Sequence, residues 1–304
     1  MKRVVFKTSG AVAHRSGAME AGNHFKNVAI LKNHTSKNQF LSCVVVALFA
    51  VSAAFASCDK KNDIVKLPNI ITYSDDGYET FEYDSLNRIT KISRYNKDEK
   101  PWYIQTLTYT GSDLVKYVRT YSESDETETE EYTKKGNQIT IEYENMLESG
   151  DRILDLNTEG YPTKYEGWNN DLSFVYTSTI QNDNVTKITT VQHCNNWDEV
   201  KKEGSINYRY DDKKSPFTHC ATPKWWMQVQ YWTIWTFNWM TDDYGSKNNV
   251  IEESWNNASL YSRGDGFNGK VEYKYEYDND GYPIKRTGGG DVITFQYKQP
   301  SKRK

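Results

Sequence analysis

From about residue 70 onward, apolar and polar residues alternate in short runs, and each run ends at a turn rich in Asn, Gly and Asp. Alternation with a period of two places successive side chains on opposite faces of a strand, and these turn residues tolerate positive φ angles. The repeated pattern is an aromatic residue, any residue, Tyr, then Asp or Thr, the turn, an apolar residue and Lys. We interpret each copy as a β-hairpin whose Lys faces water.

Seven imperfect copies of this hairpin follow one another, and internal repetition is stronger evidence for a fold than local propensity. The copies occupy residues 81–92, 107–116, 132–139, 154–164, 174–188, 208–212 and 275–285. The first five begin about 20 to 26 residues apart, the length of two strands with their connections. The pattern predicts an all-β domain. It is an antiparallel meander of repeated hairpins that twist rolls into a barrel-like or open curved sheet.

The repetition breaks between Pro216 and about Asn249, where five tryptophans fall within fifteen residues. A period of two aligns one set of apolar residues, and a period of 3.6 aligns another, so neither template accounts for the whole segment. Pro223 before it and Gly245 after it favour a helix. We predict one short aromatic-rich helix or insertion near residues 223–245, lying across the sheet.

The N-terminal segment has the features of a secretory signal. An apolar run at residues 41–57 ends in small residues and follows Lys26, Lys32 and Lys37, and it is too short to span a bilayer comfortably. We predict a signal peptide at 1–57, whose first 25 or so residues are a mis-assigned start or a long n-region. A tether at 58–67, a single β domain at 68–298 and a basic disordered tail at 299–304 follow.

Residues 55–58, Phe-Ala-Ser-Cys, resemble the lipobox of bacterial lipoproteins, in which the cysteine thiol is acylated and becomes the new N-terminus. The resemblance implies lipidation of Cys58 and attachment to a membrane. We therefore expect an exported outer-membrane lipoprotein, facing the periplasm or exposed at the surface. Phe55 departs from the usual leucine of this motif.

Composition narrows the function of the part that follows residue 57. This part contains 31 basic and 40 acidic residues, a net charge of −9, and all 23 tyrosines and 9 tryptophans of the chain. An acidic surface repels polyphosphate, and no basic stripe could follow a nucleic-acid backbone. We expect no nucleic-acid partner. The scarcity of Ala, Leu and Met there also favours strands over helices.

The hairpins are similar to those of a known family. Tyr83-Asp84, Tyr210-Asp211 and Tyr277-Asp278, the continuation at 212–217 and the segment at 246–251 resemble a family of Gram-negative lipoproteins of unknown function with a porin-like fold. The hairpins also resemble the tyrosine-aspartate repeats of large secreted toxins. The resemblance covers about residues 70–298 and implies the fold and the location. The tryptophan density at 225–239 departs from it.

Two His-Cys pairs, His193-Cys194 and His219-Cys220, are candidates for a site. Two imidazoles and two thiolates could bind zinc, but neighbouring residues on a strand point to opposite faces. In an oxidising compartment Cys194 and Cys220 could instead form a disulfide or remain free thiols. The disulfide is the favoured reading, and we expect no metal.

The tryptophans at 225, 226, 232, 235 and 239 are the candidate ligand-binding residues, since flat indole faces stack on sugar rings while their N–H groups find acceptors. The alternative, that they fill the core of the sheet, carries more weight because large apolar residues are mostly buried. Three function classes follow. They are a binding module of the envelope for a glycan or an envelope protein, a structural or assembly component without a small ligand, and a hydrolase with a carboxylate pair.

Carboxylates are abundant, but nothing singles out the spaced pair that a glycosidase needs. The acidic run at residues 122–131 lacks the spaced ligands of a calcium loop, and we interpret it as a solvated hairpin that protects a sheet edge. No phosphate-binding loop or nucleophile motif occurs. We therefore expect a protein that is not an enzyme and has no cofactor.

Overall fold

The computed structural model describes residues 64–75, 77–124, 126–144, 149–168, 172–194, 200–229, 245–256 and 268–300. All of them belong to one compact unit, which begins at Asn62. The predicted signal peptide, Cys58 and most of the tether lie outside the described residues.

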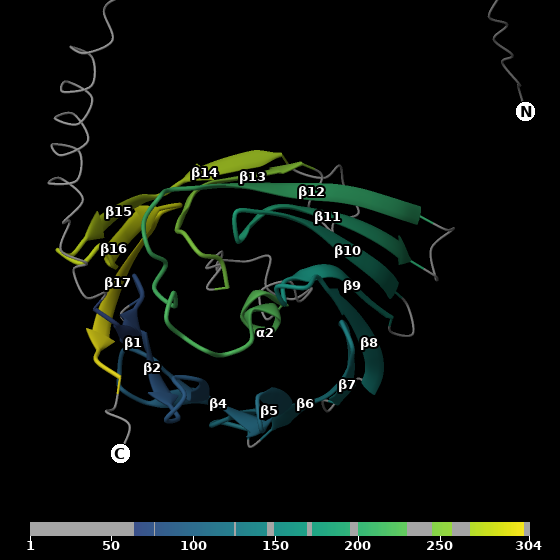
Figure 1. Ribbon diagram of the computed structural model, residues 1–304, viewed down its shortest axis with the longest axis horizontal. Coiled ribbons are helices and arrows are strands. Elements are labelled where there is room, and N and C mark those ends of the chain that lie inside the picture. Colours follow the sequence, from purple (N-terminus) through teal and green to yellow (C-terminus); the bar gives the residue numbers. More distant parts are fainter. Residues whose placement is uncertain are drawn as a thin grey trace, which may run out of the picture. The chain divides into compact units, whose positions relative to one another are not determined.

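The described chain forms one sheet of 17 strands. Neighbours in sequence pair antiparallel, except for the two short strands on either side of Tyr273, which continue one another along the same line. β1 pairs with both β2 and β17, so the meander returns on itself as a nearly closed barrel (Figure 1). This confirms the predicted all-β fold. The strands are β1 (Leu67–Thr72), β2 (Tyr78–Tyr83), β3 (Ile89–Tyr95), β4 (Pro101–Thr110), β5 (Asp113–Tyr121), β6 (Thr127–Lys135), β7 (Gln138–Glu144), β8 (Ser149–Leu156), β9 (Pro162–Trp168), β10 (Leu172–Gln181), β11 (Asn184–Cys194), β12 (Val200–Tyr210), β13 (Val250–Asn256), β14 (Gly269–Glu272), β15 (Lys274–Tyr277), β16 (Pro283–Gly288) and β17 (Asp291–Lys298).

Because paired strands run in opposite directions, and β14 continues into β15 through Tyr273, successive turns lie at opposite ends of the barrel. We call one end rim 1; it carries the turns at 84–88, 111–112, 136–137, 157–161, 182–183 and 278–282 and the long connection between β12 and β13. The other end is rim 2; its described turns are at 73–77, 96–100, 122–126 and 289–290. The Tyr-Asp pairs of the sequence pattern therefore all lie at rim 1.

The aspartate of the repeat organises its turn. Oδ1 of Asp84 accepts hydrogen bonds from the backbone N–H groups of Leu86 and Arg88, two and four residues further on. Asp278 bonds Asp280 and Tyr282 in the same way, and Asn157 does so in a third turn. The residue three positions after each has positive φ: Asn87, Gly160 and Gly281. Each turn therefore needs Asp or Asn as its first residue, and its fourth residue must tolerate positive φ.

The tyrosine of the repeat ties the strand to its neighbour. The hydroxyl of Tyr83 on β2 donates to the carbonyl of Pro68 on β1, 2.9 Å away. Tyr109, Tyr210 and Tyr297 make equivalent bonds to Ile89, Val185 and Pro283. At Tyr83, Tyr109 and Tyr210 the strand register also shifts by a bulge. The Tyr-Asp pair thus fixes both the end of a strand and the turn that follows.

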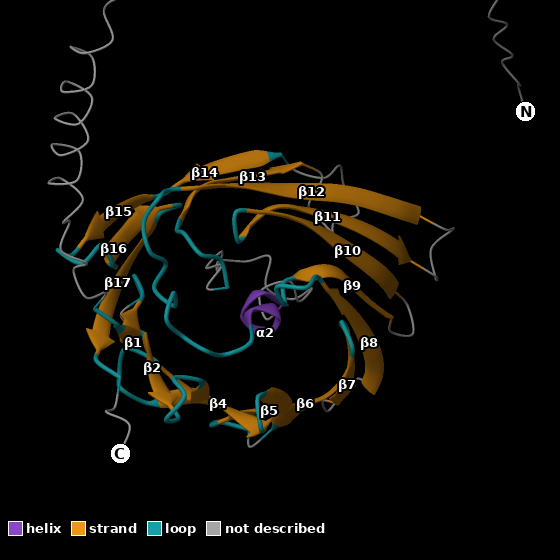
Figure 2. Cartoon of the chain, in the orientation of Figure 1, coloured by secondary structure: helices purple, strands orange, loops and turns teal. Residues whose placement is uncertain are grey.

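The described first part of the connection between β12 and β13 folds into the barrel and carries helix α2 (Lys224–Val229), the one helix of the described part. Figure 1 shows α2 inside the ring of strands, and Figure 2 shows that strands make up most of the rest. The backbone N–H of Ile89 donates to Oγ1 of Thr222, and Lys224 Nζ donates to the hydroxyl of Tyr161. This confirms the predicted short helix in the tryptophan-rich segment. Residues 230–244 lie outside the described part.

The outer face of the wall is charged. Lys91, Lys116 and Lys285, which follow the turns, form cross-strand ion pairs with Glu82, Glu131 and Glu276 at 3.0, 2.8 and 2.9 Å. Their side chains are well exposed, which confirms that these lysines face water. No helix in the described part of the chain is long and apolar enough to cross a membrane.

The acidic hairpin at 122–131 corrects an expectation. It is not at a sheet edge, because β6 pairs with β5 on one side and β7 on the other. Glu128 and Glu130 point into the barrel, where they contact arginines. Among the described acids of the run, Glu123, Glu126 and Glu131 are exposed to solvent.

Candidate binding site at the barrel mouth

Two of the five candidate tryptophans are buried around α2. Trp225 and Trp226 are 6% and 4% exposed and belong to the apolar core. The Trp225 ring packs edge-on to Tyr132 at 5.0 Å, and Trp226 Nε1 donates to the Tyr132 hydroxyl at 3.0 Å. Neither indole face is open to a ligand. Trp232, Trp235 and Trp239 lie outside the described residues.

Cys220 is a free thiol, so the structure does not show the disulfide that we favoured for Cys194 and Cys220. Its Sγ donates to Oγ1 of Thr222 at 3.3 Å, and burial raises the pKa of the thiol to about 11. Cys220 directly precedes Ala221, whose backbone N–H donates to the carbonyl of Asn87 at rim 1, whereas Cys194 ends β11 at rim 2. Ten residues of extended strand separate the two ends of β11, about 33 Å. The side chain of Cys194 lies outside the described part.

An exposed aromatic group lies instead at rim 2, where β4, β5 and β6 meet. We call Trp102, Tyr103, Arg119, Tyr121 and Glu128 the mouth cluster. Trp102 is 53% exposed, the most exposed large apolar side chain among those described. Its ring lies 5.6 Å from that of Tyr103, which in turn meets the edge of Tyr121 at 6.2 Å. The three rings therefore form a continuous aromatic surface.

Paired polar groups border this surface. Arg119 Nη1 lies 2.9 Å from Oε2 of Glu128, and the hydroxyl of Tyr121 donates to Oε1 of the same carboxylate at 3.0 Å. The guanidinium of Arg119 also lies over the ring of Tyr103, 5.2 Å from its centroid. The Arg119 and Glu128 side chains are 26% and 24% exposed, so water reaches both. The polar groups are held in place and still accessible.

The charges of the cluster are balanced. Burial acts to lower the pKa of Arg119, but Tyr117 and Glu128 beside it raise it overall, so the guanidinium stays charged. Burial raises the pKa of the Tyr103 hydroxyl well above its ordinary value, with a further contribution from Glu79. The tyrosines therefore remain neutral donors at neutral pH. One cation faces one anion, and the cluster carries no net charge.

A second layer of contacts supports the cluster from inside the barrel. Glu79 accepts hydrogen bonds from the hydroxyls of Tyr73 and Tyr103 at 2.8 and 3.0 Å. Arg94 stacks on Tyr73, 3.9 Å from the ring centroid, and both Glu79 and Arg94 are almost fully buried. Such locked neighbours reduce the conformational entropy that binding must remove. The mouth cluster is thus preorganised.

Sequence reasoning missed this site because it followed the density of tryptophans. Trp102 is a lone tryptophan between the charged turn at 96–100 and a strand that alternates regularly. An isolated indole next to a charged turn is a signal of exposure, whereas a run of indoles beside Pro223 signals burial. The inward direction of Arg119 and Glu128 depends on strand register, and a shift of one residue would reverse it.

The buried tyrosines and Cys220 predict a loss of stability at high pH. Burial raises the pKa of Tyr165 to about 12 and that of Cys220 to about 11, from 10.0 and 9.0. At a pH between the unfolded and the native pKa of each group, the native protein keeps the proton that the unfolded chain has lost. Stability is therefore complete below about pH 9 and falls toward pH 12, by up to about 1.4 kcal/mol per group and pH unit.

The check is the urea midpoint measured from about pH 8 to pH 11. A Tyr165→Phe variant keeps the ring but has no proton to lose, so its midpoint should fall less steeply. A midpoint that stays level across this range would contradict the prediction.

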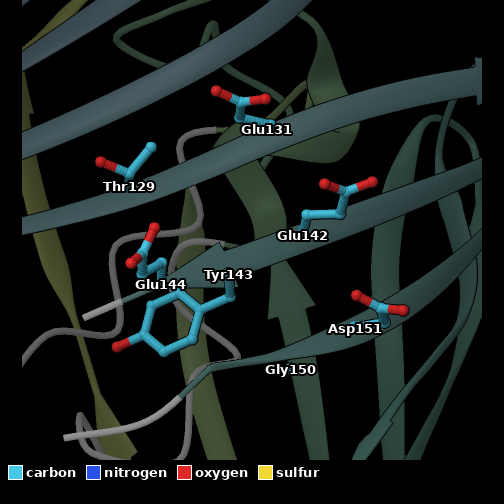
Figure 3. Close-up of a pocket in the computed structure, with 7 residues that line it drawn as sticks. All are labelled: Thr129, Glu131, Glu142, Tyr143, Glu144, Gly150 and Asp151. Atoms are coloured by element: carbon cyan, nitrogen blue, oxygen red, sulfur yellow. The ribbon is translucent and has the colours of Figure 1, made fainter. Parts of the chain in front are cut away.

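A shallow hollow of about 540 Å³ lies on another part of the wall, lined by Thr129, Glu131, Glu142, Tyr143, Glu144, Gly150 and Asp151. Figure 3 shows Glu131, Glu142 and Asp151 projecting to the same side of three neighbouring strands. Glu142 is directly opposite Glu131 on β6 and Asp151 on β8. Among the described residues, no three His, Cys, Asp or Glu side chains gather closely enough to hold a metal ion.

Replacing Glu142 by Lys is expected to raise the free energy of unfolding by about 0.5 to 1 kcal/mol, because like charges directly opposite each other destabilise a sheet. Two repulsive pairs become attractive ones. Glu142→Gln removes only the repulsion and should give a smaller gain. The measurement is urea unfolding at low and high salt, and salt should shrink the gain. Equal or lower stability of Glu142→Lys at low salt would contradict this.

Comparisons with known proteins add two solved structures. A crystal structure of a porin-like protein from Bacteroides uniformis is 14% identical, with a TM-score of 0.41, over 76% of this chain and 96% of that one. A porin-like protein from Bacteroides vulgatus is 11% identical, with a TM-score of 0.39, over 77% and 99%. No family model and no curated protein matches this chain.

Proposed function

We propose that this chain is an exported, lipid-anchored protein of the cell envelope that binds a glycan at the mouth cluster. The apolar run at 41–57 and the lipobox-like residues that end at Cys58 support export and anchoring. The exposure of Trp102 beside Tyr103, Tyr121 and the Arg119–Glu128 pair is the observation that carries binding. We propose a binding protein rather than an enzyme.

A glycan fits this chemistry better than an ion or an apolar ligand. Aromatic faces offer apolar area that stacks against the C–H faces of a sugar ring. Arg119 offers donors and Glu128 acceptors, the two kinds of group that neighbouring hydroxyls need. The absence of net charge in the cluster favours a neutral ligand. Exposed aromatic groups with a polar border are also typical of interaction sites.

The test is calorimetric titration of the mature protein, from residue 58 on, with a panel of neutral and acidic oligosaccharides. Neutral oligosaccharides should bind, and Trp102→Ala should weaken binding at least about tenfold, since loss of one aromatic contact of about 1.4 kcal/mol has this effect. Leu86→Ala removes an apolar residue of similar exposure at rim 1 and is the matched control. Its affinity should equal that of the wild type.

Two results would overturn the glycan proposal: no heat of binding from any oligosaccharide, or a Trp102→Ala variant that binds as the wild type does. Co-purification of envelope proteins that persists in Trp102→Ala would support a structural or assembly role instead. Mass spectrometry of the N-terminal peptide tests the anchor separately. An acylated Cys58 is expected, and an unmodified Met1 or Cys58 in exported protein would contradict it.

A further inference from the structure

The start of the described chain is fixed at rim 1. The carbonyl of Ile64 accepts a hydrogen bond from the hydroxyl of Tyr282 at 2.8 Å. Lys66 Nζ lies 2.6 and 2.7 Å from carboxylate oxygens of Asp278 and Asp280. All three partners belong to one rim 1 turn, and Tyr282 is fully buried. The chain therefore enters the barrel at a defined point.

Electrostatics strengthen this attachment. Burial acts to lower the pKa of Lys66, but its bonds to Asp278 and Asp280 raise it overall. Burial acts to raise the pKa of Asp278, yet the bonds from Lys66 and from the backbone of its turn lower it overall. Lys66 is therefore a cation and Asp278 an anion near neutral pH. The ion pair holds the entry point of the chain against rim 1.

The distance from this entry point to Cys58 is short. Cys58 lies six positions before Ile64, and a fully extended chain covers at most about 20 Å over six steps. The longest strands have 11 residues, about 36 Å of strand, and barrel strands tilt by about 35 to 45°, so the wall is about 25 to 30 Å high. A lipid on Cys58 can reach the plane of rim 1 but not that of rim 2.

From this geometry we propose that the domain stands on the lipid surface with rim 1 facing the bilayer and the mouth cluster at rim 2 facing away from it. The partner of rim 1 is a phospholipid bilayer. A side-on position would press the cross-strand ion pairs of Lys91, Lys116 and Lys285 onto lipid and desolvate them. The upright position leaves the mouth open to ligands in solution. This inference rests on the lipid anchor of the proposed function.

The experiment places a fluorophore at either rim of the vesicle-bound protein. Asn137→Cys labels an exposed turn at rim 1, and Ser122→Cys labels an exposed turn at rim 2. Both replaced residues are uncharged. Both variants also carry Cys194→Ser, so that the introduced cysteine is the one reactive external thiol besides residue 58. Vesicles of phosphatidylcholine contain a lipid whose headgroup bears a nitroxide, which quenches only nearby fluorophores.

We expect quenching several-fold stronger at position 137 than at position 122. The acylated protein is used for labelling, so residue 58 does not react. Equal quenching at both positions, which a side-on domain would give, would overturn the proposal, as would stronger quenching at position 122. Double replacement of Asp278 and Asp280 by Asn should reduce the difference, because it removes the ion pairs of Lys66.

The orientation can fail separately from the anchor. If the exported protein is not acylated, Cys58 is first coupled to a maleimide lipid. Position 137 or 122 then carries an incorporated ketone-bearing residue, and the fluorophore is attached to that ketone. The same order of quenching is then expected. Loss of acylation would refute the proposed anchoring, whereas the wrong order of quenching would refute the orientation alone. Glycan titrations in solution report on neither.

Discussion

Replacing Trp226 by Ala is expected to lower the free energy of unfolding by about 3 to 5 kcal/mol, the usual cost of deleting a large buried aromatic side chain. Trp226 is 4% exposed, and its ring lies 5.8 Å from that of Tyr117 on the barrel wall. The change also removes the donor that Trp226 Nε1 offers to the buried Tyr132 hydroxyl. Most domains are stable by only about 5 to 15 kcal/mol, so the loss is a large fraction of the total.

Urea unfolding followed by circular dichroism measures the change. Trp102→Ala is the matched control, since it removes the same side chain from an exposed position, and it should cost about 0.5 kcal/mol or less. Trp226→Phe keeps an aromatic ring in the core and should fall between the two. If Trp226→Ala lowered the free energy of unfolding no more than Trp102→Ala, this would show that α2 is not packed inside the barrel at rim 1.

Replacing Arg152 by Met is expected to lower the free energy of unfolding by about 3 kcal/mol, because it leaves a buried carboxylate without its cation. Arg152 Nη1 lies 3.7 Å from Oε1 of Glu130, and only 10% of the Glu130 side chain is exposed. Methionine also cannot replace the hydrogen bond that Arg152 Nη1 donates to the Tyr165 hydroxyl at 3.2 Å. It likewise loses the contact of the guanidinium with the Tyr143 ring, whose centroid lies 4.1 Å away.

A double-mutant cycle with Glu130→Gln isolates the charge effect. Once Glu130 is neutral, loss of Arg152 leaves no uncompensated charge, so the double variant should be about 1 to 2 kcal/mol more stable than the sum of the single effects. Glu142→Gln, on the outer face of the neighbouring strand, is the control carboxylate and should show no coupling with Arg152→Met. Additive effects of Arg152→Met and Glu130→Gln would show that the pair is not energetically linked.

The local part of the fold was predictable from the sequence because the Tyr-Asp repeat acts locally. Asp84 forms its own turn, and Tyr83 bonds a strand only one hairpin away. Closure of the sheet is a different matter. It depends on the pairing of β1 with β17, more than 220 residues apart, and no local pattern specifies that contact. The sequence therefore predicted a curved sheet and left a barrel and an open sheet as alternatives.

The mouth cluster was not predicted from the sequence, and the tryptophan-rich segment was predicted only in part, because both depend on contacts between distant strands. The tryptophan-rich segment was recognised as a break in the repeat, and α2 confirms its helical start. Burial of Trp225 and Trp226 requires a barrel wall to surround them, which periodicity cannot show. For the acidic run, composition suggested solvent on all sides. The register of β6 instead turns Glu128 and Glu130 toward Arg119 and Arg152.

The proposals fit together in one arrangement. The start of the described chain at Ile64 and the turns of the Tyr-Asp pairs lie at rim 1, where α2 fills the barrel with apolar side chains. The arginines, carboxylates and exposed rings of the mouth cluster lie at rim 2. One end of the domain is thus suited to attachment and packing, and the other to recognition.

A two-dimensional NMR spectrum of the indole N–H groups, recorded while a neutral oligosaccharide is added, tests binding at the mouth cluster most directly. Assignment uses the Trp102→Phe and Trp226→Phe variants, each of which removes one signal. We predict that the Trp102 signal moves with ligand concentration and saturates, while the buried Trp226 signal stays in place. A titration that shifts Trp226 and leaves Trp102 unchanged, or that shifts neither, would contradict the account.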